Sequence, residues 1–587
     1  MGNCVSRSRK GKFVINENNN CFVVNMPHKK HATSVSSEET NKMPASTQQE
    51  PNNDFVEGVV CKETDLNENE MKTFELGDHG KVLVVKQHGQ FKAVGTKCSH
   101  YGAPLVTGSL GDGRVRCPWH GACFNLTTGD IEDFPGADSL PCYQVNVEKN
   151  GDVKVRARKT ELETNKRVKK LALRDNNDER TFVIVGAGPS GAICAETLRQ
   201  EGFTGRVVLV GDEPYLPYDR IKVTKAMNVT VDKLLIRDQT YYDTNSIETM
   251  IGVKATELVP STKEVVLSNG YRIKYDKVFV ATGSSARKID IPGADLKNVC
   301  VARNVDDAAF IQSQLNKDKH VVVLGVSFIG LEAAAYCVDK VASVTVIGRD
   351  NVPLKPVFGA TIGGRIQKFL ESKGIVFKMN NGLKKCISDD AGNLNSVELN
   401  DGEILKADLC VMGVGSTLNT EFLKNSGINI NKNGSIDVNE YLQTNFEDVF
   451  AGGDIANAPV FSSNNEKVTI GHYGLAQYHG RMAAFNMVGK TKALKAVPFF
   501  WTTLFGVSFR YSGHGKAVDS MIVGDLEKMD YTAYFFDNND KVIAISSCGP
   551  TPGPIVASWA EFTTQGKTIY RKDLESDANA WLKQINN

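Results

Sequence analysis

Two cysteine–histidine pairs stand out in the first quarter of the chain. Cys98-Ser-His100 and Cys117-Pro-Trp-His120 form the pattern C-x-H…C-x2-H, with sixteen residues between the pairs. Thiolates and neutral imidazoles can share a [2Fe–2S] centre, two thiolates on one iron and two imidazoles on the other, which raises its reduction potential. Zinc sites of the same composition usually pair Cys with Cys and His with His. The spacing therefore favours an iron–sulfur centre, with zinc as the alternative.

The residues around these pairs carry a family resemblance. His100-Tyr-Gly-Ala-Pro-Leu and Trp119-His-Gly-Ala-Cys-Phe closely resemble the cluster loops of the Rieske family. No cysteine stands at positions 103 or 119, where respiratory-chain members have a disulfide pair. The resemblance is therefore to the ferredoxin and oxygenase type, which implies a lower potential. The metal ligands that it implies are Cys98, His100, Cys117 and His120.

A glycine pattern of the type G-x-G-x-x-G follows an expected strand at residues 181–185 and opens an expected helix. In this setting the glycines allow a tight turn, close approach of the backbone to a pyrophosphate, and close packing of helix on strand. The helix N-terminus supplies the anion site. Asp212 follows the next strand, where an acid can bind an adenosine ribose. By itself the motif leaves NAD and FAD open; its glycines are Gly186, Gly188 and Gly191.

The segment from Asp212 to Arg220 (Asp-Glu-Pro-Tyr-Leu-Pro-Tyr-Asp-Arg), followed by Thr224-Lys225, resembles the flavin segment of ferredoxin reductases and apoptosis-inducing factors. Val278-Phe-Val-Ala-Thr-Gly-Ser, which contains Thr282 and Gly283, and Val449-Phe-Ala-Gly-Gly-Asp454-Ile resemble the later flavin motifs of that family. The resemblance implies FAD, and with a Rieske part in front the combination resembles the apoptosis-inducing factor 3-like branch. The contacts it implies are Arg220 with the flavin pyrophosphate, Lys225 near flavin N5, and Asp454 with the ribityl chain.

A second copy of the strand–turn–helix unit reads Gly325-Val-Ser327-Phe-Ile-Gly330-Leu-Glu332. Two copies in one chain indicate two nucleotide sites. The family resemblance implies NAD(P)H here, bound at Gly325 and Gly330, and implies that Glu332 pairs with Lys225 as the candidate catalytic residues.

This second unit departs from the family at two places. Ser327 stands where the family usually has glycine, and its hydroxymethyl group either bonds a phosphate or crowds it. Gly348-Arg349 ends the next strand, where NAD-specific relatives place an acid on the ribose 2′-OH. An arginine there suits a 2′-phosphate and hence NADPH. NADH use and a decayed nucleotide site are the alternatives.

Composition limits the function classes. The 587 residues include 69 basic and 68 acidic residues, a formal net charge of +1, which gives no basic field for nucleic acid. The 13 cysteines are scattered singly, which favours a reducing compartment over a secreted disulfide scaffold. No apolar run approaches the ~18 residues that span a bilayer, and no apolar signal-peptide core follows Met1.

The N-terminus carries a lipidation pattern. Met1-Gly2-Asn3-Cys4-Val5-Ser6 fits N-myristoylation of Gly2 once Met1 is removed. One acyl chain anchors only marginally, so palmitoylation of Cys4 and nearby basic residues would supply the second signal. We therefore expect a cytoplasmic protein with peripheral attachment to the cytosolic face of a membrane. An unmodified tail is the alternative, and mitochondrial association is the alternative location.

These motifs predict a multidomain protein: a small all-β Rieske domain, two Rossmann-like α/β nucleotide-binding domains, and a C-terminal α+β domain. The short alternating segments after Asp54 are typical of a small β domain, and the polar N-terminal stretch is typical of a disordered tail. The expected parts are the tail 1–53, the Rieske domain 54–158, a linker 159–180, the FAD-binding domain 181–300 and 417–495, the NAD(P)H-binding domain 301–416, and the C-terminal reductase domain 496–587.

The sequence therefore predicts an oxidoreductase that passes electrons from NAD(P)H through FAD to its own Rieske cluster and on to an unknown acceptor. No C-x4-C follows the first helix, so a dithiol exit is not expected. Similar ferredoxin reductases have a Trp-Ser-Asp turn where this chain has Trp501-Thr-Thr, which puts their partner interface in doubt. The alternative is a redox-sensing interaction protein, related to apoptosis signalling, with weak or absent turnover.

Overall fold

The computed structural model describes residues 13–15, 21–23 and 54–586. The chain divides into two units, Met1–Asn52 and Asn53–Asn587. In the first unit, strands β1 (Phe13–Ile15) and β2 (Cys21–Val23) form an antiparallel pair where the sequence predicted only a disordered tail. Five of their six residues, all but Cys21, are of the β-branched and aromatic types that favour strands. Gly2 and Cys4 lie outside the described residues.

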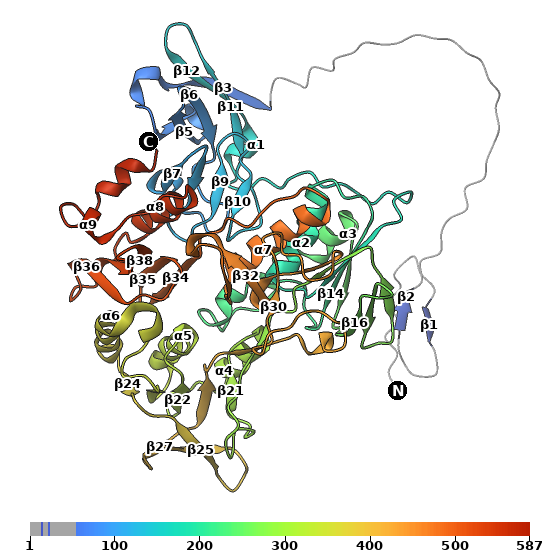
Figure 1. Cartoon of the computed structure of the whole chain (residues 1–587), viewed down its shortest axis with the longest axis vertical. Coiled ribbons are helices and arrows are strands. Elements are labelled where there is room, and N and C mark those ends of the chain that lie inside the picture. Colours follow the sequence, from blue (N-terminus) through green and yellow to red (C-terminus); the bar gives the residue numbers. More distant parts are fainter. Residues whose placement is uncertain (1–12, 16–20, 24–53, 587) are drawn as a thin grey trace, which may run out of the picture. The chain divides into compact units, whose positions relative to one another are not determined.

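The second unit begins with two antiparallel sheets, in the part of the chain that is expected to be the Rieske domain (Figure 1). Strand β12 shows why these segments are strands: Val153, Val155 and Ala157 are buried while the residues between them are partly exposed, the period of two of a half-buried strand. The six-stranded sheet has the order β3 (Phe55–Lys62), β12 (Asp152–Arg158), β11 (Cys142–Val147), β6 (Gln90–Val94), β5 (Lys81–Gln87), β4 (Glu70–Glu75). The four-stranded sheet has the order β10 (Ile131–Asp133), β9 (Cys123–Asn125), β8 (Arg114–Arg116), β7 (Ser109–Gly111).

The first nucleotide-binding sheet is parallel throughout. Its strands are almost wholly apolar, as expected for a sheet covered on both faces. Helices α2 (Pro189–Gln200) and α7 (Tyr473–Met487) pack against each other beside it. The strand order is β15 (Ile247–Ile251), β14 (Arg206–Gly211), β13 (Thr181–Val185), β19 (Lys277–Val280), β31 (Val449–Ala451). Because β31 returns to this sheet after the second nucleotide unit, the first unit is discontinuous in sequence.

The second parallel sheet repeats the arrangement, with a glycine turn between β22 and a helix. Its order is β21 (Val299–Val301), β28 (Leu409–Met412), β22 (His320–Leu324), β23 (Ser343–Ile347), β24 (Ile375–Lys378). The helices of this unit are α4 (Val305–Gln314), α5 (Phe328–Cys337) and α6 (Lys355–Glu371).

Strands outside the main sheets form small antiparallel or mixed sheets: β16 (Ala255–Val259) with β17 (Glu264–Leu267) and β18 (Arg272–Lys274); β20 (Ser284–Ala286) with β29 (Ser416–Leu418); β25 (Leu383–Ser388) with β26 (Leu394–Leu399) and β27 (Ile404–Lys406); and β30 (Ile436–Asp437) with β32 (Ala456–Val460) and β33 (Glu466–Thr469). The remaining short helices are α1 (Lys159–Leu162), α3 (Gln239–Thr244) and α9 (Arg571–Leu574).

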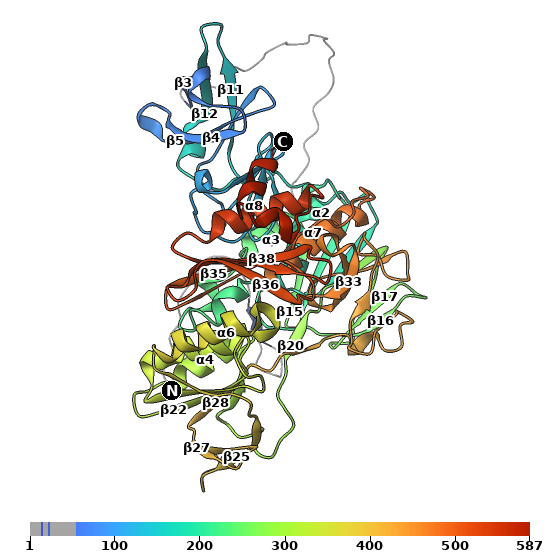
Figure 2. The same cartoon turned by 60° about the vertical axis from the view of Figure 1, so that its left-hand side comes forward.

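The C-terminal part is a five-stranded antiparallel sheet with helix α8 (Gly553–Thr564) packed on it (Figure 2). The strand order is β34 (Phe499–Leu504), β35 (Val507–Gly513), β38 (Val542–Gly549), β37 (Asp530–Phe536), β36 (Asp519–Asp525). Helix α8 also lies against β7 of the Rieske domain. The predicted fold class is confirmed. Among the described residues, no helix is both long and apolar enough to cross a bilayer.

Candidate redox site

The two predicted cluster loops have the same backbone turn. In the first loop, the Cys98 N–H donates to the Ala103 carbonyl and the Gly102 N–H donates back to the Cys98 carbonyl, both at 2.9 Å. The second loop repeats the two bonds around Cys117. Gly102 and its counterpart Gly121 have φ of 78° and 84°, in the left-handed region that favours glycine. The loops therefore present two equivalent sets of ligands.

The four predicted ligands converge in like pairs. The His100 and His120 Nδ1 atoms lie 3.2 Å apart. The contact between the two thiols raises the pKa of Cys98 and lowers that of Cys117. Burial lowers the pKa of His100 to about 3 and that of His120 well below its usual value. Both imidazoles are therefore neutral, the form that binds metal.

This arrangement fits a binuclear cluster. Two thiols on one side and two neutral imidazoles on the other match two irons with two protein ligands each. Within the part of the chain that the structure describes, no group of three or more His, Cys, Asp or Glu side chains could hold a single metal ion.

The cluster loops pack directly on the C-terminal sheet. The Trp501 ring lies 4.6 Å from the His120 ring and 6.5 Å from the His100 ring, measured between centroids. A Cβ on Gly121 would lie 2.6 Å from the Phe499 ring. On the helix side, a Cβ on Gly553 would lie 1.9 Å from the Pro118 carbonyl oxygen. Glycine at these two positions allows the close approach.

A buried ionic contact joins α8 to the Rieske strand β8. Glu561 is fully buried, and its carboxylate accepts hydrogen bonds from Arg116 Nε at 2.5 Å and Arg114 Nε at 2.7 Å. Arg116 also donates to Asp133 at 2.9 Å and to the Gly121 carbonyl at 2.8 Å. Glu561 is therefore connected, through one arginine, to the loop that carries His120.

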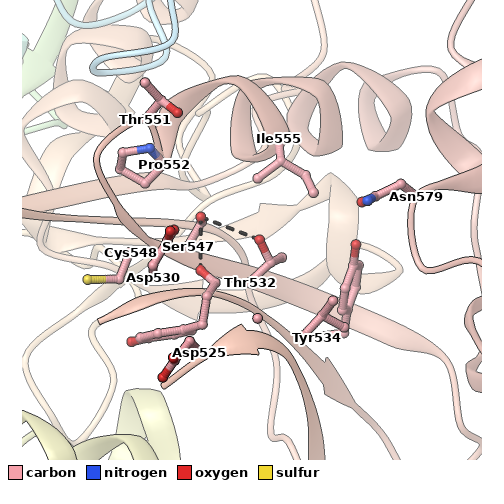
Figure 3. Close-up of a pocket in the computed structure, with 13 residues that line it drawn as sticks. Asp525, Asp530, Thr532, Tyr534, Ser547, Cys548, Thr551, Pro552, Ile555 and Asn579 are labelled. Atoms are coloured by element: carbon pink, nitrogen blue, oxygen red, sulfur yellow. Dashed lines mark hydrogen bonds between the residues drawn. The ribbon is translucent and has the colours of Figure 1, made fainter. Parts of the chain in front are cut away.

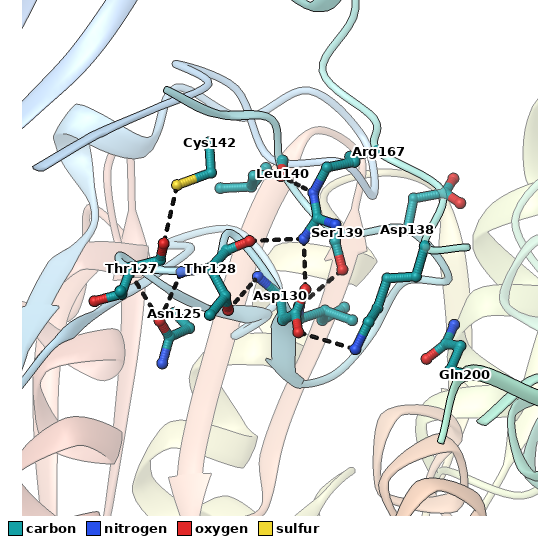
Figure 4. A network of polar contacts seen from close by, with 12 residues as sticks. Asn125, Thr127, Thr128, Asp130, Asp138, Ser139, Leu140, Cys142, Arg167 and Gln200 are labelled. Atoms are coloured by element: carbon teal, nitrogen blue, oxygen red, sulfur yellow. Dashed lines mark hydrogen bonds and ion pairs between the residues drawn. The ribbon is translucent and has the colours of Figure 1, made fainter. Parts of the chain in front are cut away.

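Further polar contacts hold the Rieske domain on the first nucleotide unit. Gly136 and the Gln477 side chain of α7 exchange two hydrogen bonds of 3.2 and 3.1 Å. Arg237 bridges Asp138 of the Rieske domain at 2.6 Å and Glu196 of α2 at 3.0 Å. The expected linker contributes as well. Arg167 donates to Asp130, Leu140 and Thr128, as Figure 4 shows. Lys169 also pairs with Asp130, at 2.9 Å.

The first glycine motif leaves room for a pyrophosphate. Gly186 has φ 118°, and a Cβ there would lie 2.2 Å from the Ala281 carbonyl oxygen. A Cβ on Gly191 would lie 1.9 Å from the Gly186 oxygen. A Cβ on Gly188, in contrast, would meet nothing within 4 Å, and no side chain caps the α2 N-terminus that follows it. The space and the uncapped N–H groups fit the anionic part of FAD.

Two other predicted flavin residues, Asp212 and Arg220, belong to the segment after β14. Asp212 is exposed directly after β14. Arg220 pairs with Glu213 at 2.5 Å and lies over the Tyr218 ring, so Glu213 positions the guanidinium. The sequence analysis missed this partner, although Glu213 stands within the same motif.

Two later flavin motifs meet at Asp454. Its carboxylate accepts hydrogen bonds from Ser284 Oγ at 2.7 Å and Arg303 at 3.0 Å. Thr282 Oγ1 donates to the Asn419 carbonyl at 2.6 Å, and Gly283 has φ 64°. These contacts bring the segment after β19 next to the segment after β31.

The predicted pair of Lys225 and Glu332 is present as an ion pair of 2.8 Å. Glu332 is only 5% exposed and accepts two further hydrogen bonds, from Thr224 Oγ1 at 2.5 Å and from Thr502 Oγ1 at 2.7 Å. Thr224 and Lys225 belong to the first nucleotide unit and Thr502 to the C-terminal sheet, whereas Glu332 belongs to α5. The carboxylate therefore joins three parts of the fold, and the two threonines were missed by the sequence analysis.

His472 is a further residue that the sequence did not single out. Its ring lies 5.5 Å from Trp501, and its Nδ1 accepts a hydrogen bond from the Leu475 N–H at the start of α7. Burial lowers the pKa of His472 to about 4, and the charges of Asp454 and Lys225 act on it as well. His472 therefore contacts Trp501 and is also influenced by the charges of two predicted flavin residues.

In the second glycine motif, Gly325 and Gly330 are required by packing: Cβ atoms there would lie 2.3 Å from the Gly413 oxygen and 2.1 Å from the Gly325 oxygen. Ser327 is exposed, and its hydroxyl donates to the Gly413 carbonyl at 3.3 Å. The serine hydroxyl thus bonds the backbone of the segment that follows β28.

The structure explains Gly348. A Cβ there would lie 2.5 Å from Val326, just as a Cβ on Gly211 would lie 2.5 Å from Ala187 in the first unit. By this correspondence the residue after the glycine, exposed Arg349, occupies the place of Asp212. The first unit therefore has an acid, Asp212, at the position where the second unit has Arg349.

A cavity of about 410 Å³ opens elsewhere, between strands β36 to β38 and the start of α8 (Figure 3). Ser547 and Thr532 are joined by a 3.4 Å hydrogen bond in its wall. None of the predicted site residues lines it.

Comparisons with known proteins agree with this arrangement. Residues 57–144 match the model of the Rieske [2Fe-2S] domain, and residues 180–480 match that of the pyridine nucleotide-disulphide oxidoreductases. The apoptosis-inducing factor 3 proteins of Mus musculus and Homo sapiens are each 40% identical over 528 residues, 89% of this chain and 86% of theirs. The covalent putidaredoxin reductase–putidaredoxin complex has a chain with TM-score 0.65 and 25% identity, covering 70% of this chain and 98% of that one. The chain therefore belongs to the apoptosis-inducing factor 3 family, as a FAD-dependent NAD(P)H oxidoreductase with its own Rieske [2Fe–2S] domain.

Proposed function

We propose that this protein transfers electrons from NAD(P)H through FAD to the Rieske cluster of the same chain, and from there to an external acceptor. Flavin supplies the junction, since it accepts a hydride and can release electrons singly. The residues of the chain bind and orient the three redox groups and exclude water between them. Cys98, His100, Cys117 and His120 would hold the cluster.

The observation that supports this proposal is the position of strand β34. Its side chains contact both a predicted cluster ligand and the ion pair of the predicted flavin site. Successive side chains of a strand point to opposite faces. Trp501 accordingly contacts His120, while the next residue, Thr502, donates to Glu332. Glu332 in turn holds Lys225, which the family resemblance places near flavin N5. One peptide unit thus links the aromatic contact at the cluster to the ion pair at the flavin.

The remaining nucleotide residues would act by positioning. The uncapped α2 N-terminus and the open space at Gly188 would hold the FAD pyrophosphate, with Asp212 on the ribose. Arg349 replaces the corresponding acid in the second unit, so we propose that it binds a 2′-phosphate and that NADPH is used.

Stopped-flow absorbance tests the route. Mixing the holoprotein with NADPH or NADH should bleach the flavin, and cluster reduction should follow. Trp501→Leu should slow the second phase at least tenfold and leave the first unchanged. Trp119→Leu is the matched control: its ring also lies near His120, at 6.3 Å, but is exposed to solvent. If the cluster is reduced at the same rate in Trp501→Leu and Trp119→Leu, electron transfer by way of Trp501 is excluded. Failure of both nucleotides to bleach the flavin would favour the redox-sensing alternative.

The lipid anchor is a separate proposal. Gly2 and Cys4 would attach the chain to the cytosolic face of a membrane. Intact-mass measurement after expression in a eukaryotic host tests it, since myristoylation adds a defined mass to the N-terminal peptide. An unmodified Gly2 would rule out the anchor without affecting the electron route.

A further inference from the structure

The guanidinium of Arg510, on β35, is buried, and its hydrogen bonding includes no carboxylate. Arg510 is 7% exposed, and its one hydrogen bond among the described residues runs from Nη1 to the Phe509 carbonyl at 3.0 Å. Its Nε is buried without a hydrogen-bond partner. Across residues 54–586, no carboxylate forms an ion pair with it. A buried charged group in this state is costly.

Two other buried arginines, among the residues that the structure describes, are satisfied. Arg116 has two carboxylates, from Glu561 and Asp133. Arg199 donates to four backbone carbonyl oxygens. The unpartnered Nε of Arg510 therefore points to a group that the protein atoms themselves do not supply.

The position of Arg510 identifies that group. Arg510 lies directly opposite Trp501 in the antiparallel pair β34–β35, so the two side chains share a face of the sheet. Trp501 on this face contacts His120. The positive charge of Arg510 also acts on Cys117 and on His120. The guanidinium therefore lies beneath the second cluster loop, although it belongs to the C-terminal domain.

We infer that Arg510 is a positioning residue for the Rieske cluster, supplying a positive charge and an Nε–H donor to its sulfur atoms and thereby raising its reduction potential. A centre of two ferric ions, two sulfides, two thiolates and two neutral imidazoles has no net charge, and one added electron makes it a monoanion. A buried cation stabilises the anionic state selectively, because the low-dielectric surroundings screen it little.

The charge persists at neutral pH and comes from another domain. Burial lowers the pKa of Arg510 to about 10, still well above neutrality. Because Arg510 lies outside residues 54–158, the potential of the cluster should depend on docking of the Rieske domain against β35. The inference rests on the cluster alone and not on the proposed route from flavin.

An EPR-monitored redox titration of the full holoprotein tests this inference. Dithionite reduces the cluster without nucleotide, so the result is independent of the proposed electron route. Arg510→Met should lower the equilibrium constant for cluster reduction at least tenfold, which is about 59 mV for a one-electron couple. Arg510→Lys should stay within about threefold of the parent protein. Arg481→Met is the matched control, because Arg481 is equally buried, but the charges that act on it come from Asp130, Glu201, Glu132 and Tyr478 and not from the cluster ligands; it should show no change.

Two results would overturn the inference. One is an Arg510→Met protein with full iron and sulfide content and an unchanged potential. The other is an Arg510→Lys protein with the same fall in potential as Arg510→Met, since the charge would then be irrelevant. If Arg510→Met fails to bind iron, Arg510→Gln replaces it in the titration. If Arg510→Met and Arg510→Gln both lose the cluster, the test falls to Arg510→Lys. An Arg510→Lys protein that keeps the cluster and its potential supports the inference, and one that loses either contradicts it.

Discussion

Glu561→Gln removes one negative charge from the contact between α8 and the Rieske strand β8 and changes the side-chain shape little. Glu561 is fully buried and serves both Arg114 and Arg116. Removing one partner of a buried ion pair costs about 3–5 kcal/mol, because the opposite charge is left uncompensated. Arg116 keeps Asp133, so the lower end of this range, about 3 kcal/mol, is expected. At 1.4 kcal/mol per tenfold, this shifts the docking equilibrium roughly a hundredfold towards the undocked domain.

The expected result is a separation of two kinetic phases. Flavin bleaching by NAD(P)H should be unaffected, because Glu561 touches neither glycine motif. Cluster reduction should slow, since the Rieske domain spends less time against Trp501. Thermal unfolding should show the loss of stability. Glu248→Gln is the control: it breaks an exposed pair with Arg206, which is worth less than about 1 kcal/mol.

A double-mutant cycle with Arg114→Met separates this contact from a general loss of packing. Coupled residues show interaction energies of roughly 0.5–3 kcal/mol. The reasoning is wrong if the cycle gives no coupling, or if Glu561→Gln matches the Glu248→Gln control in both stability and cluster reduction.

Three further predictions concern the nucleotide sites. Glu332→Gln leaves Lys225 without its countercharge and should slow flavin reduction in stopped-flow by up to about 100-fold, the scale of a misplaced positioning group; an unchanged rate would show that the ion pair is structural only. Gly188→Val fills the space before α2 and should lower the flavin-to-protein absorbance ratio after gel filtration, and full flavin content would place the pyrophosphate elsewhere. Arg349→Glu should raise the KM for NADPH about tenfold and lower that for NADH; parallel changes for both nucleotides would contradict a 2′-phosphate contact.

The cluster loops were predictable because their chemistry is local. Cys98 and His100 share one turn, and Cys117 and His120 share another, so the spacing of residue types already encodes the loop geometry. The glycines were predictable for the same reason, since Gly186 and Gly191 approach backbone atoms of their own unit. The predicted pairing of Lys225 with Glu332 came from the family resemblance, and the ion pair is present in the structure.

Residues far apart in the chain were not predictable in this way. Glu561 lies 445 positions from Arg116, and no local pattern distinguishes it from an ordinary helix glutamate. Trp501 belongs to the Trp-Thr-Thr segment, whose two threonines depart from the Trp-Ser-Asp turn of ferredoxin reductases, and no local pattern predicts a contact for it. The structure shows instead that it contacts the Rieske histidines of its own chain.

The sequence by itself indicated which turns suit an iron–sulfur centre and a nucleotide, because thiolate, imidazole and glycine requirements are met within a few residues; the choice of FAD and NAD(P)H came from the family resemblance. Only the tertiary structure decided how those sites face one another. The docking of the Rieske domain brings Trp501, Arg510 and Glu561 to one side of it, and such contacts depend on side chains that meet only after separate domains have folded and packed.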